Sequence, residues 1–200
     1  MRKAIQHLKQ ADPVLAGIIE QVGSYGITFL EPDFETLVKS ITSQQLSGKA
    51  AKTIYGRVIA AAGGRLTPES LLKLRPARLR ALGLSRQKIE YIRDLARHTR
   101  SGRVDFTRLS ACSDDEVIEH LTAVKGIGIW TAHMFLIFAL RRENVLPVGD
   151  LGIRAAIRKA YGLSELPQPA EMASIAAGWH PYCSVASWYL WRSLETNAGL

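Results

Sequence analysis

Two glycines separated by a single residue, Gly126 and Gly128, interrupt an apolar pattern with helical spacing, and they constrain the fold more than any other feature of the chain. Leu121, Val124 and Ile127 supply the apolar side chains that would pack one helix against the next. Because glycine has no Cβ, both positions permit positive φ angles and the close backbone approach that a tight turn needs. The pattern therefore predicts a helix, a short hairpin and a second helix directly after it.

Signals that start helices recur along the whole chain. A capping Ser, Thr or Asp, or a Pro at the first helical position, stands before most apolar stretches with helical spacing. We expect helices to start at Asp12-Pro13, Glu31-Pro32-Asp33, Ser47, Thr67-Pro68, Pro76, Ser85, Ser113, about Ile129, Asp150, Pro169 and Pro181. No segment alternates apolar and polar residues for long enough to form a strand. The sequence therefore predicts an all-α fold.

Length and composition exclude several classes of protein. A chain of 200 residues buries roughly 70% of its unfolded surface, so we expect one domain or two closely packed lobes. The longest uninterrupted apolar run, residues 134–140, is too short to span a bilayer. Arg2 and Lys3 precede no apolar secretory segment. Cys112 and Cys183 are isolated from each other, which argues against a disulfide framework, a zinc site or an iron–sulfur cluster. We expect a cytoplasmic protein with no membrane partner and no metal.

Positive charge is concentrated in the middle of the chain. The formal net charge is +8, and residues 32–110 hold most of the 26 Lys and Arg but only one third of the 18 Asp and Glu. The basic residues in the second half of this stretch are Lys73, Arg75, Arg78, Arg80, Arg86, Lys88, Arg93, Arg97, Arg100, Arg103 and Arg108. Such a concentration is either a solvated helical face or an electrostatic footprint for a polyanion.

The predicted hairpin favours the second interpretation, in which the basic residues form a surface that binds a polyanion. The second helix begins directly after the glycines, so its unsatisfied N–H groups and its positive dipole end face the turn, where a phosphate fits without any sequence readout. The alternative is an ordinary helix–helix connection that happens to use two glycines. The surrounding residues favour a phosphate-binding hairpin made of Val124, Lys125, Gly126, Ile127 and Gly128.

Four motifs together resemble those of a known family. They are Ile41-Thr-Ser-Gln-Gln-Leu-Ser47, Val124-Lys-Gly-Ile-Gly-Ile-Trp-Thr-Ala132, Pro147-Val-Gly-Asp-Leu-Gly-Ile-Arg154 and Trp179-His-Pro-Tyr-Cys-Ser184. Over about residues 30–195 the chain resembles the helix–hairpin–helix DNA glycosylase superfamily, and within it the 3-methyladenine DNA glycosylase II branch. The resemblance implies two helical lobes with a DNA-binding cleft between them. We assign residues 32–148 to a central lobe with the hairpin, and residues 1–31 and 149–200 to a terminal lobe.

The resemblance implies that Asp150 is the catalytic residue. Breaking an N-glycosidic bond develops positive charge on the sugar, and a carboxylate beside the sugar stabilises that charge and orients or deprotonates the attacking water. Asp150 also stands where it would cap the following helix. The two roles are compatible.

Trp130 decides between two kinds of glycosylase. In the glycosylases that also cut the strand, the resemblance implies a lysine two residues after the second hairpin glycine, and that lysine attacks the sugar covalently. Trp130 stands there in this chain, so no amine is available for a Schiff base and we expect a monofunctional enzyme. Lys125 precedes the glycines, which favours a surface or phosphate-contact role for it.

An enzyme that acts on a base in duplex DNA must flip the base out and fill the gap. The resemblance implies that Gln45 is the residue that fills it, with the neighbouring Leu46 as a second candidate. The alternative is that Gln44 and Gln45 are simply polar residues at the end of a helix.

The resemblance also implies an aromatic base pocket, to which we assign Trp130, Trp191 and Met134. Alkylated purines are cationic and electron-poor, so indole faces bind them by stacking and by cation–π attraction, of order 1–2 kcal/mol. The chain has Met134 where some relatives have a pocket Tyr, and Cys183 where some have Arg. These departures leave the choice of base open.

The sequence therefore predicts a monofunctional DNA glycosylase of base excision repair that removes alkylated purines such as 3-methyladenine and 7-methylguanine and leaves an abasic site. The expected partner is double-stranded DNA with alkylated bases, bound by a monomer without a cofactor. The resemblance implies a monovalent cation held by the hairpin carbonyls. Three alternatives remain: a non-enzymatic DNA-binding module, a glycosylase with another base preference, and a strand-cleaving glycosylase that uses another lysine.

Overall fold

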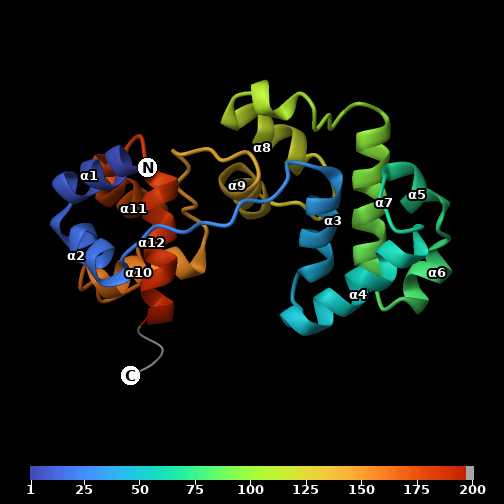
Figure 1. The fold of residues 1–200 in the computed structure, drawn as a ribbon, viewed down its shortest axis with the longest axis horizontal. Helices are drawn as coiled ribbons and strands as arrows, with labels where there is room; N and C mark the ends of the chain where they lie inside the picture. Colours follow the sequence, from blue (N-terminus) through green and yellow to red (C-terminus); the bar gives the residue numbers. More distant parts are fainter. Residues whose placement is uncertain (197–200) are drawn as a thin grey trace. The chain divides into compact units, whose positions relative to one another are not determined.

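The computed structural model describes residues 1–196, and their side chains up to Glu195 (Figure 1). Over these residues the chain is helical and contains no strand, which confirms the predicted all-α fold. The helices are α1 (Arg2–Ala11), α2 (Pro13–Val22), α3 (Phe34–Ser43), α4 (Gly48–Ala61), α5 (Pro68–Lys73), α6 (Pro76–Ala81), α7 (Arg86–Arg100), α8 (Asp114–Thr122), α9 (Ile129–Phe138), α10 (Leu151–Ala160), α11 (Pro169–Ile175) and α12 (Cys183–Thr196), with two short 3₁₀ helices, η1 (Leu109–Ala111) and η2 (Ala176–Trp179).

Most of the predicted helix starts are confirmed to within a residue, because they depend on short-range capping. The side chains of Asp12, Ser47 and Ser85 each accept a hydrogen bond from a backbone N–H in the first turn of the helix that follows. Ser113 and Glu116 form a reciprocal capping box at the start of α8. Within residues 1–196, no helix combines the length and the apolar character needed to cross a bilayer.

The chain forms two compact units. The first unit holds residues 1–29 and the chain from Leu136 onward, and the second unit holds residues 30–135. The chain passes from one unit to the other within α9, earlier than the boundary at 148/149 drawn from the sequence. The segment after α9 belongs to the first unit because it is hydrogen-bonded to α12: Ser184 Oγ accepts from Val145 N at 3.0 Å, and Ser184 N donates to Glu143 O at 2.9 Å.

In the first unit α1, α2 and α10 pack against α12, and α11 packs against η2. Its core includes the fully buried Trp179 and Tyr189. Asp12 ties the unit together, because one carboxylate oxygen caps α2 while the other accepts hydrogen bonds from Tyr161 Oη at 2.5 Å and Trp179 Nε1 at 2.8 Å. A buried carboxylate costs free energy unless it is fully hydrogen-bonded, and this one is well supplied with donors.

The second unit is built around α7. Figure 1 shows α3 on one side of α7 and α5 with α6 on the other. The apolar face of α7, with Ile92 and Leu95, is completely buried. The strongly apolar first part of α9 completes the unit. This arrangement brings the end of α3, the middle of α7 and the hairpin between α8 and α9 into contact.

Candidate active site

The hairpin between α8 and α9 requires glycine at residue 126 for two reasons. Gly126 has a φ of +81°, in the left-handed region that residues with a Cβ rarely adopt. A Cβ at this position would also lie 2.0 Å from Cδ2 of Tyr91, whose ring packs directly against the glycine. The turn is closed by a 3.1 Å hydrogen bond from Ile127 N to Val124 O, and the side chains of Val124 and Ile127 are buried.

Gly128 has a different reason to be glycine. Both glycines permit a positive φ, but Gly126 adopts one and Gly128 does not. Gly128 is exposed, and a Cβ on it would meet no atom within 4 Å. The backbone at Gly128 is therefore open to close approach from outside, directly before the N-terminus of α9.

The backbone N–H groups of the hairpin divide into two sets. Those of Lys125 and Ile127 are already used, since Lys125 N donates to Asp94 Oδ2 at 3.0 Å and Ile127 N donates within the turn. Those of Gly126 and Gly128 have no acceptor among residues 1–196. The donors available to an external anion therefore include the two glycine amides, which lie directly before the N-terminal, positive dipole end of α9.

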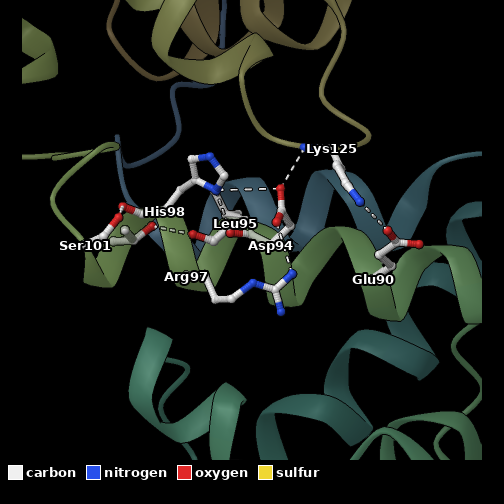
Figure 2. A network of polar contacts seen from close by, with 8 residues as sticks. Glu90, Asp94, Leu95, Arg97, His98, Ser101 and Lys125 are labelled. Carbon is white, nitrogen blue, oxygen red and sulfur yellow. Dashed lines mark hydrogen bonds and ion pairs between the residues drawn. The ribbon is translucent and has the colours of Figure 1, made fainter.

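Asp94, on α7, holds the hairpin from below (Figure 2). Its carboxylate is buried and also accepts a 3.0 Å hydrogen bond from Arg97 Nη2, while His98 Nδ1 lies 3.6 Å from Oδ2. Burial alone raises the pKa of this carboxyl, but the Lys125 N–H, Arg97 and His98 outweigh burial and hold the pKa below its ordinary value. The Lys125 ammonium forms a 2.8 Å ion pair with Glu90.

The turn after α3 places Gln45 in a strained conformation. Gln44 has φ −49° and ψ 129°, Gln45 has φ 55°, and Leu46 N donates to Ser43 O at 3.1 Å, which is a type II turn with glutamine where glycine is usual. Lys88 Nζ fixes the turn through hydrogen bonds to Thr42 O at 2.7 Å and Gln44 O at 2.5 Å.

The side chains at the tip of this turn are presented outward. Gln45 is exposed and Leu46 is 39% exposed. Strain in an ordered turn is maintained only when its surroundings over-determine it, and such strain concentrates at functional sites. Lys88, whose pKa is lowered by burial, is part of that surrounding structure.

Asp150 is the N-cap of α10, as the sequence allows. Its Oδ1 accepts two hydrogen bonds, from Ile153 N at 2.8 Å and from Trp191 Nε1 at 2.9 Å. Asp150 is 7% exposed, so its surroundings are largely protein rather than water. Two N–H donors of fixed direction on one oxygen determine the plane of the carboxylate.

Trp191 donates a hydrogen bond to Asp150 in addition to presenting an aromatic surface. Its ring stacks on Phe138, with ring centroids 5.7 Å apart and an interplanar angle of 28°. Trp191 also lines a cavity of about 540 Å³ in the first unit, together with Phe138, Trp188 and Ile27. Sequence reasoning missed Phe138 and Ile27, because only their position in the fold distinguishes them from core residues.

The other two predicted pocket residues lie on α9, in the second unit. Trp130 and Met134 are one helical turn apart and so share a face of α9. Trp130 is 47% exposed, which is unusual for so large an apolar side chain, and Met134 is partly buried. Cys183 is fully buried in the first unit, where burial raises the pKa of its thiol to about 11. This thiol is therefore a core group.

No metal centre is built from acidic, thiol or imidazole side chains in the described part of the chain, because no three His, Cys, Asp or Glu residues within it are grouped to hold an ion. Two hairpin carbonyl oxygens have the chemistry of a site for an alkali cation. Val124 O and Gly126 O each accept one hydrogen bond, at 3.1 Å, from Ile127 N and Gln44 Nε2 respectively. A carbonyl oxygen has a second lone pair.

Comparison with known proteins agrees with these features. The chain matches the profile of the HhH-GPD superfamily base excision DNA repair proteins over residues 38–181. It is 35% identical to DNA-3-methyladenine glycosylase 1 of Schizosaccharomyces pombe, over 96% of this chain and 87% of that protein.

Two solved structures have the same fold. A DNA-3-methyladenine glycosidase of Bacillus halodurans superposes with a TM-score of 0.89 at 42% identity, covering 98% of this chain and 90% of that one. The 3-methyladenine DNA glycosylase of Schizosaccharomyces pombe, solved in complex with abasic DNA, superposes with a TM-score of 0.82 at 35% identity, covering 94% of this chain and 95% of that one. The resemblance drawn from the four motifs is thereby confirmed: the chain belongs to the HhH-GPD superfamily of base excision DNA repair proteins.

Proposed function

We propose that this protein is a monofunctional DNA glycosylase that hydrolyses the N-glycosidic bond of alkylated purines, of the 3-methyladenine and 7-methylguanine type, in double-stranded DNA and leaves an abasic site. The similar proteins named above are 3-methyladenine glycosylases, and one of them was solved with abasic DNA. The observation that carries the proposal is a single oriented carboxylate, that of Asp150, held by Ile153 N and Trp191 Nε1.

The chemistry follows from that carboxylate. As the bond between sugar and base breaks, positive charge develops on the deoxyribose, and an anion fixed beside the sugar stabilises it without having to reorganise. The same carboxylate orients the water that attacks the sugar carbon and accepts its proton. A purine alkylated on the ring already carries positive charge and leaves as a neutral base, so the reaction needs no separate acid.

The second unit binds the DNA in this proposal. The Gly126 and Gly128 amides hold a phosphate at the positive dipole end of α9, and Gln45, with Leu46 beside it, fills the gap left by the flipped base. Trp130, Met134 and Trp191 contact the extruded base, and the indoles attract its positive charge. The hairpin accounts for affinity without sequence preference, as expected for an enzyme that must search all DNA.

A monovalent cation at the hairpin belongs to the same proposal. Val124 O and Gly126 O are neutral carbonyl ligands of the kind that replace the hydration shell of K⁺ in proteins. A cation there adds positive charge next to the bound phosphate. DNA affinity should therefore be higher in potassium chloride than in tetramethylammonium chloride at equal ionic strength, because the larger ion does not fit between carbonyls.

The direct test is incubation of methylated duplex DNA with the protein, followed by chromatography of the released material. Free 3-methyladenine and 7-methylguanine are expected, together with intact strands that contain abasic sites. If no base is released, the protein is instead a DNA-binding module without glycosylase activity. Borohydride reduction during the reaction should trap no covalent adduct, because Trp130 has no amine; a trapped adduct would show that another lysine acts as a nucleophile.

A further inference from the structure

Gly152, the second residue of α10, lies against the hydrogen-bonded pair formed by Asp150 and Trp191. A Cβ on Gly152 would lie 3.1 Å from Asp150 Oδ1, 3.3 Å from Trp191 Cδ1 and 3.5 Å from Trp191 Nε1. The backbone of Gly152 is helical and has no positive φ, so any residue could adopt its conformation. Its lack of a side chain therefore matters only for the space that it leaves.

The two neighbours have little freedom to give way. Asp150 Oδ1 is fixed by Ile153 N at 2.8 Å, which is also the capping bond of α10, and by Trp191 Nε1 at 2.9 Å. The Trp191 ring is stacked on Phe138 at 5.7 Å between centroids. An added methyl group at 3.1–3.3 Å is closer than the 3.5–4.0 Å optimum for carbon contacts. It would therefore separate the indole from the carboxylate or rotate the carboxylate.

We propose that Gly152 is a positioning residue for the glycosylase reaction: its missing side chain lets the Trp191 indole reach Asp150 Oδ1 and so sets the orientation of the carboxylate. This inference rests on the proposed role of Asp150 in catalysis. Gly152 acts through the indole and touches no DNA in this account. A side chain at residue 152 therefore affects the chemical step and leaves DNA binding, which we assign to the second unit, unchanged.

The chain offers a matched control directly before Asp150 and three residues before Gly152. Gly149 also has no positive φ, and a Cβ on it would meet nothing within 4 Å. Gly149→Ala makes the same chemical change in the loop directly before α10, without the contact. A loss of rate that only Gly152→Ala shows is then due to the contact of the new methyl group with Asp150 and Trp191, and not to the loss of a glycine as such.

The experiment measures two quantities for each variant: the single-turnover rate of base release from methylated duplex DNA, and the Kd for a duplex that contains an abasic-site analogue. Gly152→Ala should lower the rate by about 10- to 100-fold, as expected for a catalytic group displaced by a fraction of an ångström to 1 Å. Its Kd should equal that of the wild type. Gly149→Ala should match the wild type in both quantities. Equal rates for the two alanine variants would overturn the proposal.

A double-mutant cycle with Trp191→Phe tests whether the glycine acts through the indole. Phenylalanine keeps the stack on Phe138 but has no N–H for Asp150, so Trp191→Phe alone should lower the rate and leave the Kd unchanged. Adding Gly152→Ala to Trp191→Phe should then cost no further rate, since the interaction it disturbs is already absent. Full additivity would show that Gly152 acts elsewhere and would overturn the proposal.

Two further outcomes separate this inference from the proposed function. If Gly152→Ala does not fold, Trp191→Phe decides. Base release at the wild-type rate contradicts positioning by the indole, and a reduced rate supports it when the Kd for a duplex with a non-hydrolysable 2′-fluorinated 7-methylguanine nucleotide is unchanged, because that Kd includes the contact between the indole and the base. If Asp150→Asn releases bases as fast as the wild type, the proposed function itself fails. If Asp150→Asn is inactive while Gly152→Ala is as fast as Gly149→Ala, only the role of Gly152 is lost.

Discussion

The side chain of Gln44 donates a 3.1 Å hydrogen bond to the carbonyl oxygen of Gly126, and so joins the turn after α3 to the hairpin before α9. The backbone carbonyl of Gln44 is in turn held by Lys88 of α7. The element proposed to enter the DNA helix and the element proposed to hold its phosphate therefore share one hydrogen-bonded network within the second unit.

Gln45→Gly should make the protein more stable and less active. The left-handed conformation of Gln45, with φ 55°, costs about 1–3 kcal/mol for a residue with a Cβ, so glycine should raise the free energy of unfolding by about 1 kcal/mol after its own entropy cost. Loss of the side chain that fills the gap should slow base release about tenfold, which corresponds to about 1.4 kcal/mol. Urea unfolding and single-turnover kinetics measure the two effects.

Gln45→Ala is the control for that experiment, because alanine removes the side chain but keeps the strain. It should slow base release as much as Gln45→Gly without any gain in stability. If both variants release bases at the wild-type rate, Gln45 does not fill the gap and Leu46 becomes the candidate.

The two hairpin glycines should respond differently to alanine. Gly126→Ala must adopt a φ near +81° against the Tyr91 ring, so it should lower the free energy of unfolding by about 3 kcal/mol. Gly128→Ala meets no atom of the protein, so it should unfold like the wild type but bind duplex DNA more weakly, because its methyl group occupies the side from which a phosphate approaches. Tight DNA binding by Gly128→Ala would contradict the phosphate site.

Asp94→Asn should destabilise the protein in a pH-dependent way. The pKa of Asp94 is lower in the folded state than its ordinary value of 3.8, so the ionised form stabilises the fold above that value, and this contribution is lost as the pH falls through the lower, folded-state pKa. We expect the variant to be about 1–3 kcal/mol less stable at neutral pH and to approach the wild type below about pH 4. Denaturant unfolding from pH 7 downward measures the difference.

Glu90→Gln is the matched control for Asp94→Asn. Glu90 also contacts Lys125, but through an exposed ion pair, and such pairs contribute less than about 1 kcal/mol. Its loss should change stability little at any pH. A large effect of Glu90→Gln would mean that the Lys125 side chain, and not its backbone N–H, anchors the hairpin.

The features that sequence reasoning predicted are those set by neighbouring residues. Capping by Asp12, Ser85 and Ser113, the hydrogen bond from Ile127 N to Val124 O that closes the hairpin turn, and the cap at Asp150 all depend on contacts within about four residues, so the local pattern determines them. The sequence shows that both hairpin glycines permit a positive φ but not which of them adopts one, because glycine allows several turn conformations and the packing selects among them.

The features that sequence reasoning missed join residues far apart in the chain. Asp94 accepts from Lys125, Lys88 donates to Gln44 O, and Trp191 donates to Asp150, over separations of 31, 44 and 41 residues. No spacing rule connects such pairs, because they meet only after the helices have packed. Trp191 was accordingly expected to be a stacking surface, and its hydrogen bond to the carboxylate appears only in the fold.

The most direct test of this account is the rate of 7-methylguanine release by Asp150→Asn, measured with its affinity for the same duplex DNA. The amide keeps the size and the capping acceptor of Asp150 but removes the negative charge. The account predicts unchanged DNA affinity and a rate reduced by at least about 100-fold. Release at the wild-type rate would contradict it, because the reaction would then not depend on the carboxylate.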